Sequence, residues 1–374
     1  MSTRFAVIPA ALSFFLITLN ASMVTTALPV IGRDLGSGAG LAWVLTGYSL
    51  VFAVCLLPAG AWADRVGAGR AFTVGLGVFA ATSVLCAVSG DLAVLLVVRA
   101  VQGAAAAAVL PSGLAMLNAA HTDPADRARA VGRWAAAGAV ALVIGSPLGG
   151  AVTTLVGWQG TFWLNVPLAL VALATAVRVR TTPRARRTSY GLGLLTTPPV
   201  VVSSVTGFAL NFASYGAIFV VTLWLQQDLG RSALATGLVF VPMTVLIIPA
   251  NLLAARLTAR RGTWQTVLIG QILMITGLIG LALADARFFV AWLLPIGAGA
   301  GLIAPAATTM MLNGVPSDRS GWGAGLLNAT RQLGSGAAPA ILGALLTATG
   351  FRTTMAVAAA VIALPAARRV KSFH

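Results

Sequence analysis

The feature that most constrains this chain is the recurrence of long apolar runs. A helix needs about 20 apolar residues to cross the hydrocarbon core of a bilayer. Twelve such runs occur, at residues 5–31, 41–63, 71–89, 92–117, 131–156, 158–178, 200–226, 233–257, 264–284, 287–312, 321–346 and 352–367. Backbone amides cannot bond water inside lipid, so these runs must be helical. No run shows the period-two alternation of membrane strands. The sequence predicts an all-α polytopic membrane protein with about 12 transmembrane helices.

Composition excludes the main soluble alternatives. Of the 374 residues, 58% are hydrophobic and 9% are charged, which leaves too little polar surface for a soluble domain. A net charge of +16 would suggest nucleic-acid binding in a soluble protein, but here the charges sit in short loops. We therefore expect a lipid bilayer as a partner, and no nucleic acid. The first run is too long for a signal peptide and is interpreted as a retained span.

The basic residues predict how the chain is oriented in the membrane. Cytoplasmic loops of membrane proteins carry an excess of lysine and arginine. With a cytoplasmic N-terminus, 18 basic residues fall in inside loops and tails and four in outside loops. We therefore expect a multi-pass protein of the cell (plasma or inner) membrane with both termini in the cytoplasm.

The chain divides into two similar halves. Five arginines crowd the start of the long connection at residues 178–199. This seam predicts an N-terminal six-helix bundle at 1–180, a basic cytoplasmic linker at 181–199 and a C-terminal six-helix bundle at 200–374. Residues 63–67 after the second span resemble residues 258–262 after the eighth, and residues 145–147 in the fifth resemble 337–339 in the eleventh. Such internal repeats are typical of transporters, and they predict two bundles related by pseudo-symmetry.

The most informative string is the turn at residues 60–70, which contains Gly60, Asp64, Arg65, Gly67 and Arg70. A carboxylate at this place can bind an arginine or the N-terminus of a neighbouring helix, and so latch the cytoplasmic face shut. A loop whose charges only determine the orientation of the chain in the membrane would explain the same residues. From these residues alone, the two interpretations are equally favoured.

This string closely resembles the loop between helices 2 and 3 of the major facilitator superfamily. Other positions match further motifs of that family. Arg99, Gln102 and Gly103 match its fourth-span motif, and Gly138, Gly145, Pro147, Gly149 and Gly150 match its antiporter-like motif. Asp126, Arg127 and Arg129 match the loop before the fifth span, and we assign them to the same predicted latch. Residues 158–167 and 331–334 resemble the fourteen-helix branch of drug:proton antiporters. The resemblance implies the major facilitator fold and secondary transport by alternating access. This chain, however, has no room for the two extra central helices.

A second departure concerns proton coupling. Asn20 stands where the resembled branch usually has aspartate, the sequence contains no glutamate, and none of its eight aspartates falls within a predicted span. Proton-coupled transporters usually rely on a membrane-embedded carboxylate. An asparagine side chain forms hydrogen bonds but does not titrate. The family pattern therefore favours proton antiport, whereas the residues do not supply its usual carrier.

Two arginines, Arg99 and Arg331, lie inside predicted spans. A structural role is favoured for Arg99, which could snorkel outward or bond carbonyls of the first span. Arg331 lies roughly 15 Å deep, near the midplane, and must face water, carbonyls or ligand. We expect a midplane substrate cavity with positive or neutral potential, lined by Asn20, Ser22, Thr25, Asn328, Arg331 and Gln332. Such a cavity favours neutral or anionic amphiphiles.

These observations predict a secondary active transporter that exports small amphipathic molecules, such as drugs or secondary metabolites, with proton antiport left open. One alternative is an uncoupled facilitator or exchanger of the same fold for neutral or anionic substrates. Another is a truncated homologue that does not transport, because the last span is short. Zinc-protease and hydrolase motifs are absent from the sequence, so we expect neither an enzyme, nor a metal site, nor a cofactor. A monomer is expected.

Overall fold

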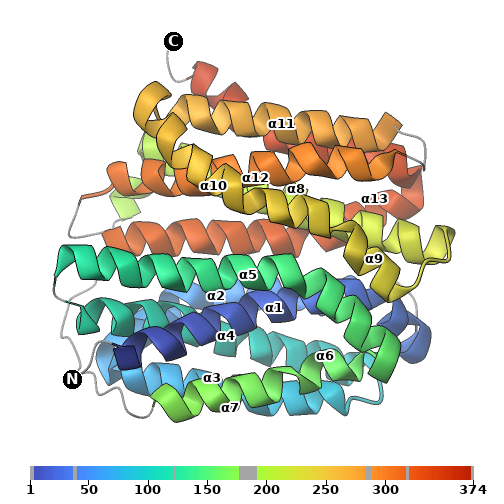
Figure 1. Cartoon of the computed structure of the whole chain (residues 1–374), viewed down its shortest axis with the longest axis horizontal. Helices are drawn as coiled ribbons and strands as arrows, with labels where there is room; N and C mark the ends of the chain where they lie inside the picture. The colour runs from blue at the N-terminus through green and yellow to red at the C-terminus, as the bar shows by residue number, and fades with distance from the viewer. Residues whose placement is uncertain are drawn as a thin grey trace. The chain divides into compact units, whose positions relative to one another are not determined.

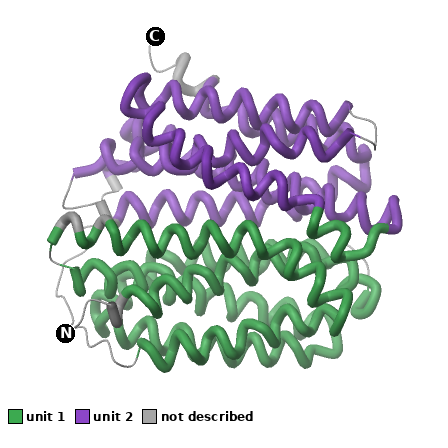
Figure 2. Tube along the Cα trace, in the orientation of Figure 1, with its two compact units in different colours: residues 1–188, 231–238 green, residues 189–230, 239–374 purple. Residues whose placement is uncertain are grey.

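A computed structural model describes residues 4–36, 40–121, 123–176, 192–283, 288–316 and 320–371. Contacts between Cα atoms divide the chain into two compact units (Figure 2). Unit 1 contains Met1–Thr188 and Arg231–Leu238, and unit 2 contains Ser189–Gly230 and Val239–His374. The predicted linker lies outside the described residues up to position 191. Its last part forms a short 3₁₀ helix, η1 (Leu192–Thr196), and the first residues of α8.

Unit 1 is built from the first seven helices of the chain (Figure 1). They are α1 (Arg4–Leu35), α2 (Trp43–Val66), α3 (Ala68–Ala87), α4 (Leu92–Ala120), α5 (Pro124–Val156), α6 (Gln159–Trp163) and α7 (Asn165–Ala176), joined by the separate short helix α9 (Ala233–Val239). Helix α1 packs mainly on α5 and α7, and α4 packs on α2 and α3. The helices therefore bury one face against each other and leave the other available to lipid.

Unit 2 contains the remaining long helices. They are α8 (Pro198–Leu223), which runs into the π-helical turn η2 (Trp224–Asp228), α10 (Val241–Arg261), α11 (Thr263–Leu283), α12 (Phe289–Asn313) and α13 (Ser320–Lys371). Helix α8 packs mainly on α13, and α12 packs on α10 and α11 (Figure 1). Close approach depends on glycine, because a Cβ at Gly334 would collide with the backbone of Phe208.

The number of membrane passes agrees with the sequence. In the described part of the chain, eleven helices are long and apolar enough to cross a bilayer. The last of them, Trp322–Ala366, is interrupted at Gly350, where φ is 80° and ψ is 176°. Its backbone therefore forms two helices across a break, which correspond to the predicted spans at 321–346 and 352–367. The all-α fold with about twelve spans is confirmed.

Local backbone geometry repeats between the two units. Helices α2 and α10 end on Gly67 and Gly262, with φ values of 93° and 89°, and each glycine N–H bonds the carbonyl four residues earlier. Gly157 and Gly350, with φ values of 82° and 80°, follow the fifth and eleventh spans. These angles favour glycine because a Cβ would be strained there. The weak sequence repeat thus corresponds to the same helix-ending geometry at matching positions.

Candidate functional site

Arg99 in α4 is fully buried inside unit 1, with 0% of its surface exposed. Its Nε donates to the carbonyl oxygen of Val44 at 3.1 Å, and Nη1 donates to Oε1 of Gln102 at 2.6 Å. Its Cζ lies 4.1 Å from the ring centroid of Tyr48 and 5.8 Å from that of Phe162. Hydrogen bonds and an aromatic face replace part of the hydration that a buried guanidinium loses, and Nη2 has no hydrogen-bond partner among the described residues.

The residues that contact Arg99 are themselves held by neighbouring helices. Gln102 is also fully buried, and its Nε2 donates to the hydroxyl of Ser83 in α3 at 2.8 Å. Gly103 faces α2 so closely that a Cβ there would collide with the carbonyl oxygen of Tyr48. The predicted structural environment of Arg99 is therefore present, but the expected partner helix was wrong. The arginine bonds a carbonyl of α2, the second span, because Gly103 brings α4 against that helix.

Arg331 in unit 2 has a more open environment, because its side chain is only partly buried. Its Nη2 donates to the carbonyl oxygen of Ala304 at 2.7 Å and to the hydroxyl of Thr308 at 3.1 Å, both on α12. Its Nε is buried without a hydrogen-bond partner among the described residues. The remaining nitrogen, Nη1, makes no hydrogen bond to a described residue either. This arginine therefore keeps donors that a ligand could use.

The neighbours of Arg331 on α13 are largely engaged with their own helix. Asn328 donates from Nδ2 to the carbonyl of Ala324 at 3.1 Å. Gln332 accepts at Oε1 from the hydroxyl of Ser335 at 3.1 Å. Both are partly buried. Of the three predicted cavity residues on this helix, Arg331 is the one that reaches another helix through its side chain.

Asn20 in α1 makes a contact that the sequence did not predict. Asn165 at the start of α7 donates from Nδ2 to Oδ1 of Asn20 at 2.9 Å, and both side chains are fully buried. Within the described part of the chain, Nδ2 of Asn20 and Oδ1 of Asn165 have no partner. Asn20 therefore faces the interior of unit 1 and ties two helices together through neutral amides.

The other predicted cavity residues of α1 are also buried in unit 1. Ser22 lies against α5, where a Cβ at Gly145 would contact its side chain. Thr25 donates its hydroxyl to the carbonyl of Ala21 at 2.9 Å. The structure places Asn20, Ser22 and Thr25 in unit 1 and Asn328, Arg331 and Gln332 in unit 2. A cavity lined jointly by these two sets stays a prediction.

The predicted antiporter-like motif is a surface of close helix contacts on α5. Cβ atoms at Gly138 and Gly149 would meet Phe14 and Met23 of α1, respectively. A Cβ at Gly150 would collide with the carbonyl oxygen of Ala233 in α9. Pro147 lies inside the helix between these contacts. The motif residues therefore let α5 approach both α1 and α9 at backbone distance.

The predicted latch string occupies the end of α2 and the start of α3. Asp64 is partly buried in the last turn of α2, while Arg65 and Arg70 are exposed. Gly67 separates the two helices, and a Cβ at Gly60 would meet no atom within 4 Å. The helix extends beyond the predicted end of the span at residue 63. A latch at this turn stays a prediction.

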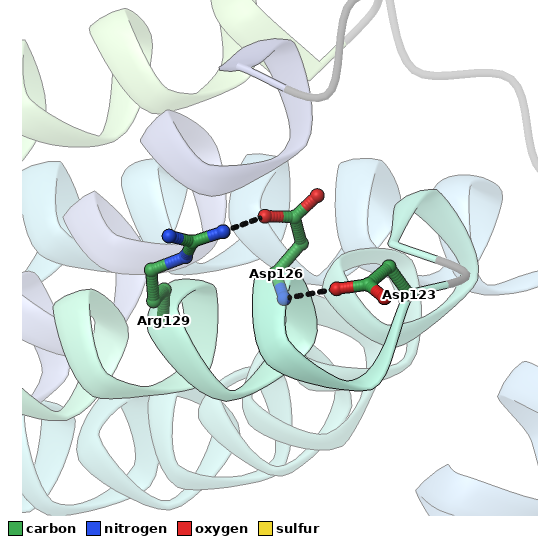
Figure 3. Close-up of polar contacts among 3 residues, drawn as sticks. All are labelled: Asp123, Asp126 and Arg129. Carbon is green, nitrogen blue, oxygen red and sulfur yellow. Dashed lines mark hydrogen bonds and ion pairs between the residues drawn. The ribbon is translucent and has the colours of Figure 1, made fainter.

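The second charged string, residues 126–129, was predicted to lie in a loop, but the structure places it in a helix. Asp126, Arg127 and Arg129 lie in the first turns of α5. Figure 3 shows Asp126 and Arg129 there, with Asp123 at the start of the helix. Asp123 caps this helix by accepting from the backbone N–H of Asp126 at 2.8 Å, and Pro124 occupies its first turn. These are strong helix-start signals, so the helix begins before the apolar run.

The side chains of the same turn form surface contacts. Arg129 forms an exposed ion pair with Asp126 (Figure 3). Arg127 donates from Nε to the carbonyl oxygen of His121 at 3.1 Å. Each contact joins residues close in sequence, so this string organises the entry into α5.

Some residues of these sites carry no sequence signal that marks their contacts. Asn165 is a polar residue in an apolar run, which suggests a buried hydrogen bond but does not identify its partner. Thr308 lies next to Thr309 in a largely apolar part of α12, and nothing in the sequence relates it to Arg331. Val44 contributes only its carbonyl oxygen, which every residue possesses. These contacts depend on which helices meet.

Comparison with known proteins agrees with this architecture. The family model for the Major Facilitator Superfamily matches residues 10–339. The methylenomycin A resistance protein of Bacillus subtilis (strain 168) is 30% identical, over 90% of this chain and 86% of its own length. The multidrug resistance protein Stp of Mycobacterium tuberculosis (strain CDC 1551 / Oshkosh) is 28% identical, over 91% and 75%.

Among solved structures, a bacterial homologue of the human lysosomal transporter Spinster, in an inward-facing and occupied conformation, has the same fold. Its TM-score is 0.79 at 18% identity, and the match covers 97% of this chain and 95% of the other. A family match over most of the sequence and a 30% identical relative lead to one conclusion. The chain belongs to the Major Facilitator Superfamily and is a multi-pass membrane transporter.

Proposed function

We propose that this protein exports small amphipathic molecules from the cytoplasm by alternating access of its two units. It works as a monomer in the plasma membrane with both termini in the cytoplasm. Membership of a transporter family and the names of its relatives, which are antibiotic and multidrug resistance proteins, support export. The excess of arginine in alternate loops supports the orientation.

The observation that carries the substrate class is the environment of Arg331. Among the described residues, the hydrogen bonds of this arginine use only Nη2, and its partners are a backbone carbonyl and a hydroxyl. Neither Arg331 nor Arg99 pairs with a carboxylate among the described residues, whereas Arg129 pairs with Asp126 at the surface. A partly buried guanidinium without a counter-ion attracts negative charge strongly in a medium of low dielectric constant. We therefore propose neutral and anionic amphiphiles as substrates.

Two dyes with the same xanthene ring system and opposite charge test this proposal. Export of anionic fluorescein and cationic rhodamine 123 is measured in inside-out vesicles that contain the protein. We expect fluorescein to be the better substrate and Arg331→Ala to remove most of that preference. Preferential transport of rhodamine 123 that is unchanged by Arg331→Ala contradicts the proposed substrate class. Methylenomycin A, the compound in the name of one relative, is a third substrate to measure.

A second candidate is an exchanger or facilitator that is not coupled to protons. The Asn20–Asn165 pair favours it, because neutral amides occupy the α1 position that carries a carboxylate in the resembled branch. In proteoliposomes, fluorescein flux of the wild type should then not respond to an imposed pH gradient, whereas Asn20→Asp should gain a response. A wild-type flux that follows the gradient favours proton antiport. Absence of flux for all three compounds favours a homologue that does not transport.

We also propose roles for the charged turns. Asp64 latches the cytoplasmic end of unit 1, and its location in the last turn of α2 between exposed arginines supports this role. Cysteine labelling at Arg65→Cys, with and without Asp64→Asn, tests it. A labelling rate that is the same in both backgrounds contradicts the latch.

A further inference from the structure

We propose that Thr308 is a specificity-determining residue that positions Arg331 for an anionic substrate. It acts through the arginine and need not touch the substrate itself. The proposal rests on the proposed function, because it concerns the same guanidinium, and it assigns a role to a residue of α12 that no sequence motif marks.

The contacts form a closed triangle on α12. Nη2 of Arg331 donates to the carbonyl oxygen of Ala304 at 2.7 Å and to Oγ1 of Thr308 at 3.1 Å. The hydroxyl of Thr308 donates in turn to the same carbonyl of Ala304 at 2.9 Å. The single hydroxyl proton is used on the carbonyl, so the hydroxyl oxygen is left to accept from the arginine. The polarity of each bond in the triangle is therefore determined.

This arrangement requires a hydroxyl at position 308. A carbonyl alone holds one N–H of the guanidinium and leaves the plane of the group free to turn. The second acceptor fixes both N–H groups of Nη2, and so fixes the direction in which Nη1 points. Valine has the shape of threonine but no acceptor, whereas serine keeps the acceptor.

The other side of the arginine stem passes close to α8. A Cβ at Gly207 would lie 3.3 Å from Cγ of Arg331 and 3.3 Å from Oγ1 of Thr330. The stem therefore runs past a position that has no side chain. Since α8 limits the stem and α12 holds Nη2, the guanidinium has one preferred orientation within unit 2. Nε is buried without a partner, which leaves Nη1 as the nitrogen available to a ligand.

A matched control lies on the same helix. Thr309 is adjacent, is equally classed as partly buried, and donates its hydroxyl to the carbonyl of Pro305 at 3.1 Å. Its hydroxyl forms no hydrogen bond with Arg331, whose partners on α12 are Ala304 and Thr308. Thr309→Val therefore makes the same chemical change one residue away and reproduces any general effect of removing a threonine hydroxyl from α12.

The first experiment measures fluorescein binding to purified, detergent-solubilised protein by fluorescence anisotropy. Loss of a hydrogen bond to a charged group should weaken binding about tenfold in Thr308→Val. Thr308→Ser should bind as tightly as the wild type, and so should Thr309→Val. Rhodamine 123 should not bind more weakly to Thr308→Val. Equal weakening in Thr308→Val and Thr309→Val, or of both dyes, would indicate a structural effect and overturn the proposal.

A double-mutant cycle separates action through Arg331 from direct action. If Thr308 works only by positioning the arginine, Thr308→Val should have no further effect on fluorescein binding in an Arg331→Ala background. Independent, multiplying effects contradict the proposal. If Arg331→Ala weakens binding but Thr308→Val does not, the positioning role fails and the proposed substrate class survives. If Arg331→Ala binds fluorescein normally, the proposed substrate class itself fails.

A second measurement does not depend on substrate identity. Phenylglyoxal modifies accessible guanidinium groups, and mass spectrometry reports the rate at each arginine. The rate at Arg331 should change at least severalfold in Thr308→Val, because the orientation of the group is released, and stay unchanged in Thr309→Val. An Arg331 rate that is the same in both variants and the wild type contradicts the positioning role even if fluorescein does not bind.

Discussion

Arg99 and Arg331 are both charged side chains inside membrane-spanning helices, but their surroundings differ. Each places a permanent positive charge in a membrane-spanning helix, where desolvation is costly. Arg99 is fully enclosed in unit 1 by hydrogen bonds from two of its nitrogens and by the ring of Tyr48. Arg331 is partly buried in unit 2 and is bonded through one nitrogen.

This difference in burial suggests how to distinguish an embedded charge that stabilises the fold from one that binds a ligand. Enclosure on all sides stabilises a fold and keeps ligands out, so Nη2 of Arg99 is inaccessible although it has no hydrogen-bond partner among the described residues. A charge held along one edge is less useful to stability and remains available for binding. On this basis, substitutions of Arg99 should change stability and substitutions of Arg331 should change transport.

The largest expected effect is on the stability of unit 1. Arg99→Leu leaves Oε1 of Gln102 without its donor in a fully buried site and removes the packing on Tyr48. We expect unfolding in mixed micelles to become easier by about 2–5 kcal/mol. Arg99→Lys should recover only part of this loss, because an ammonium group does not reproduce the planar fork. Wild-type stability of Arg99→Leu would refute the enclosed-charge interpretation.

A second substitution tests the cause of that loss. If the buried acceptor is responsible, Gln102→Leu combined with Arg99→Leu should be more stable than Arg99→Leu alone. Replacing a buried polar pair with apolar residues is often neutral or favourable. Further destabilisation in the double variant would show that packing, and not hydrogen bonding, dominates.

The next effect concerns the contact that brings α4 to α2. Gly103→Val introduces a side chain where even a Cβ would collide with the carbonyl oxygen of Tyr48. We expect about 1–3 kcal/mol of destabilisation from overpacking. Gly77→Val on α3 is the control, because a Cβ there meets no atom within 4 Å. Thermal unfolding followed by size-exclusion chromatography distinguishes the two, and similar midpoints would contradict the close contact.

Arg331→Ala should affect stability much less than Arg99→Leu. Its two acceptors, Ala304 and Thr308, still bond each other when the arginine is removed. The expected change is about 1 kcal/mol or less in the same unfolding assay. A loss as large as that of Arg99→Leu would mean that both arginines are structural.

The smallest effect is expected for Arg129 at the start of α5, because this third arginine is solvent-exposed. Side chains of Arg129 and Asp126 are 70% and 53% exposed. Arg129→Ala should change stability by less than about 1 kcal/mol. Asp123→Ala should cost about 1 kcal/mol, because the helix loses its N-cap. Comparable losses for Arg129→Ala and Arg99→Leu would show that charge burial does not determine the ranking.

Much of the fold was predictable from the sequence because apolar length alone determines a span. The helix ends were less predictable: Asp123 and Pro124 start α5 several residues before its apolar run. The partners of Arg99 could not be predicted: it could have snorkelled outward or bonded the first span, and instead it bonds Val44 in the second. The apolar run shows that Arg99 is embedded in a span. The close contact of Gly103 with α2 decides which backbone carbonyl Arg99 bonds.

The candidate site shows the same limit. Arg331 was identified by its depth in a span without carboxylates, which is a property of the sequence. Thr308 and Ala304, which hold it, are 23 and 27 residues away and became visible only with the packing of α12 on α13. Asn20 was recognised as a departure from a motif, but its pairing with Asn165 across 145 residues was not.

The contrast between the two arginines is tested most directly by measuring their reactivity in one sample. Phenylglyoxal modification of the folded protein, followed by mass spectrometry, gives a rate for each residue. The structure predicts that Arg331 is modified and that fluorescein slows its modification, while Arg99 stays unmodified until the protein unfolds. Equal reaction at Arg99 and Arg331, or modification of Arg99 alone, would contradict the assignment of a structural and a ligand-binding arginine.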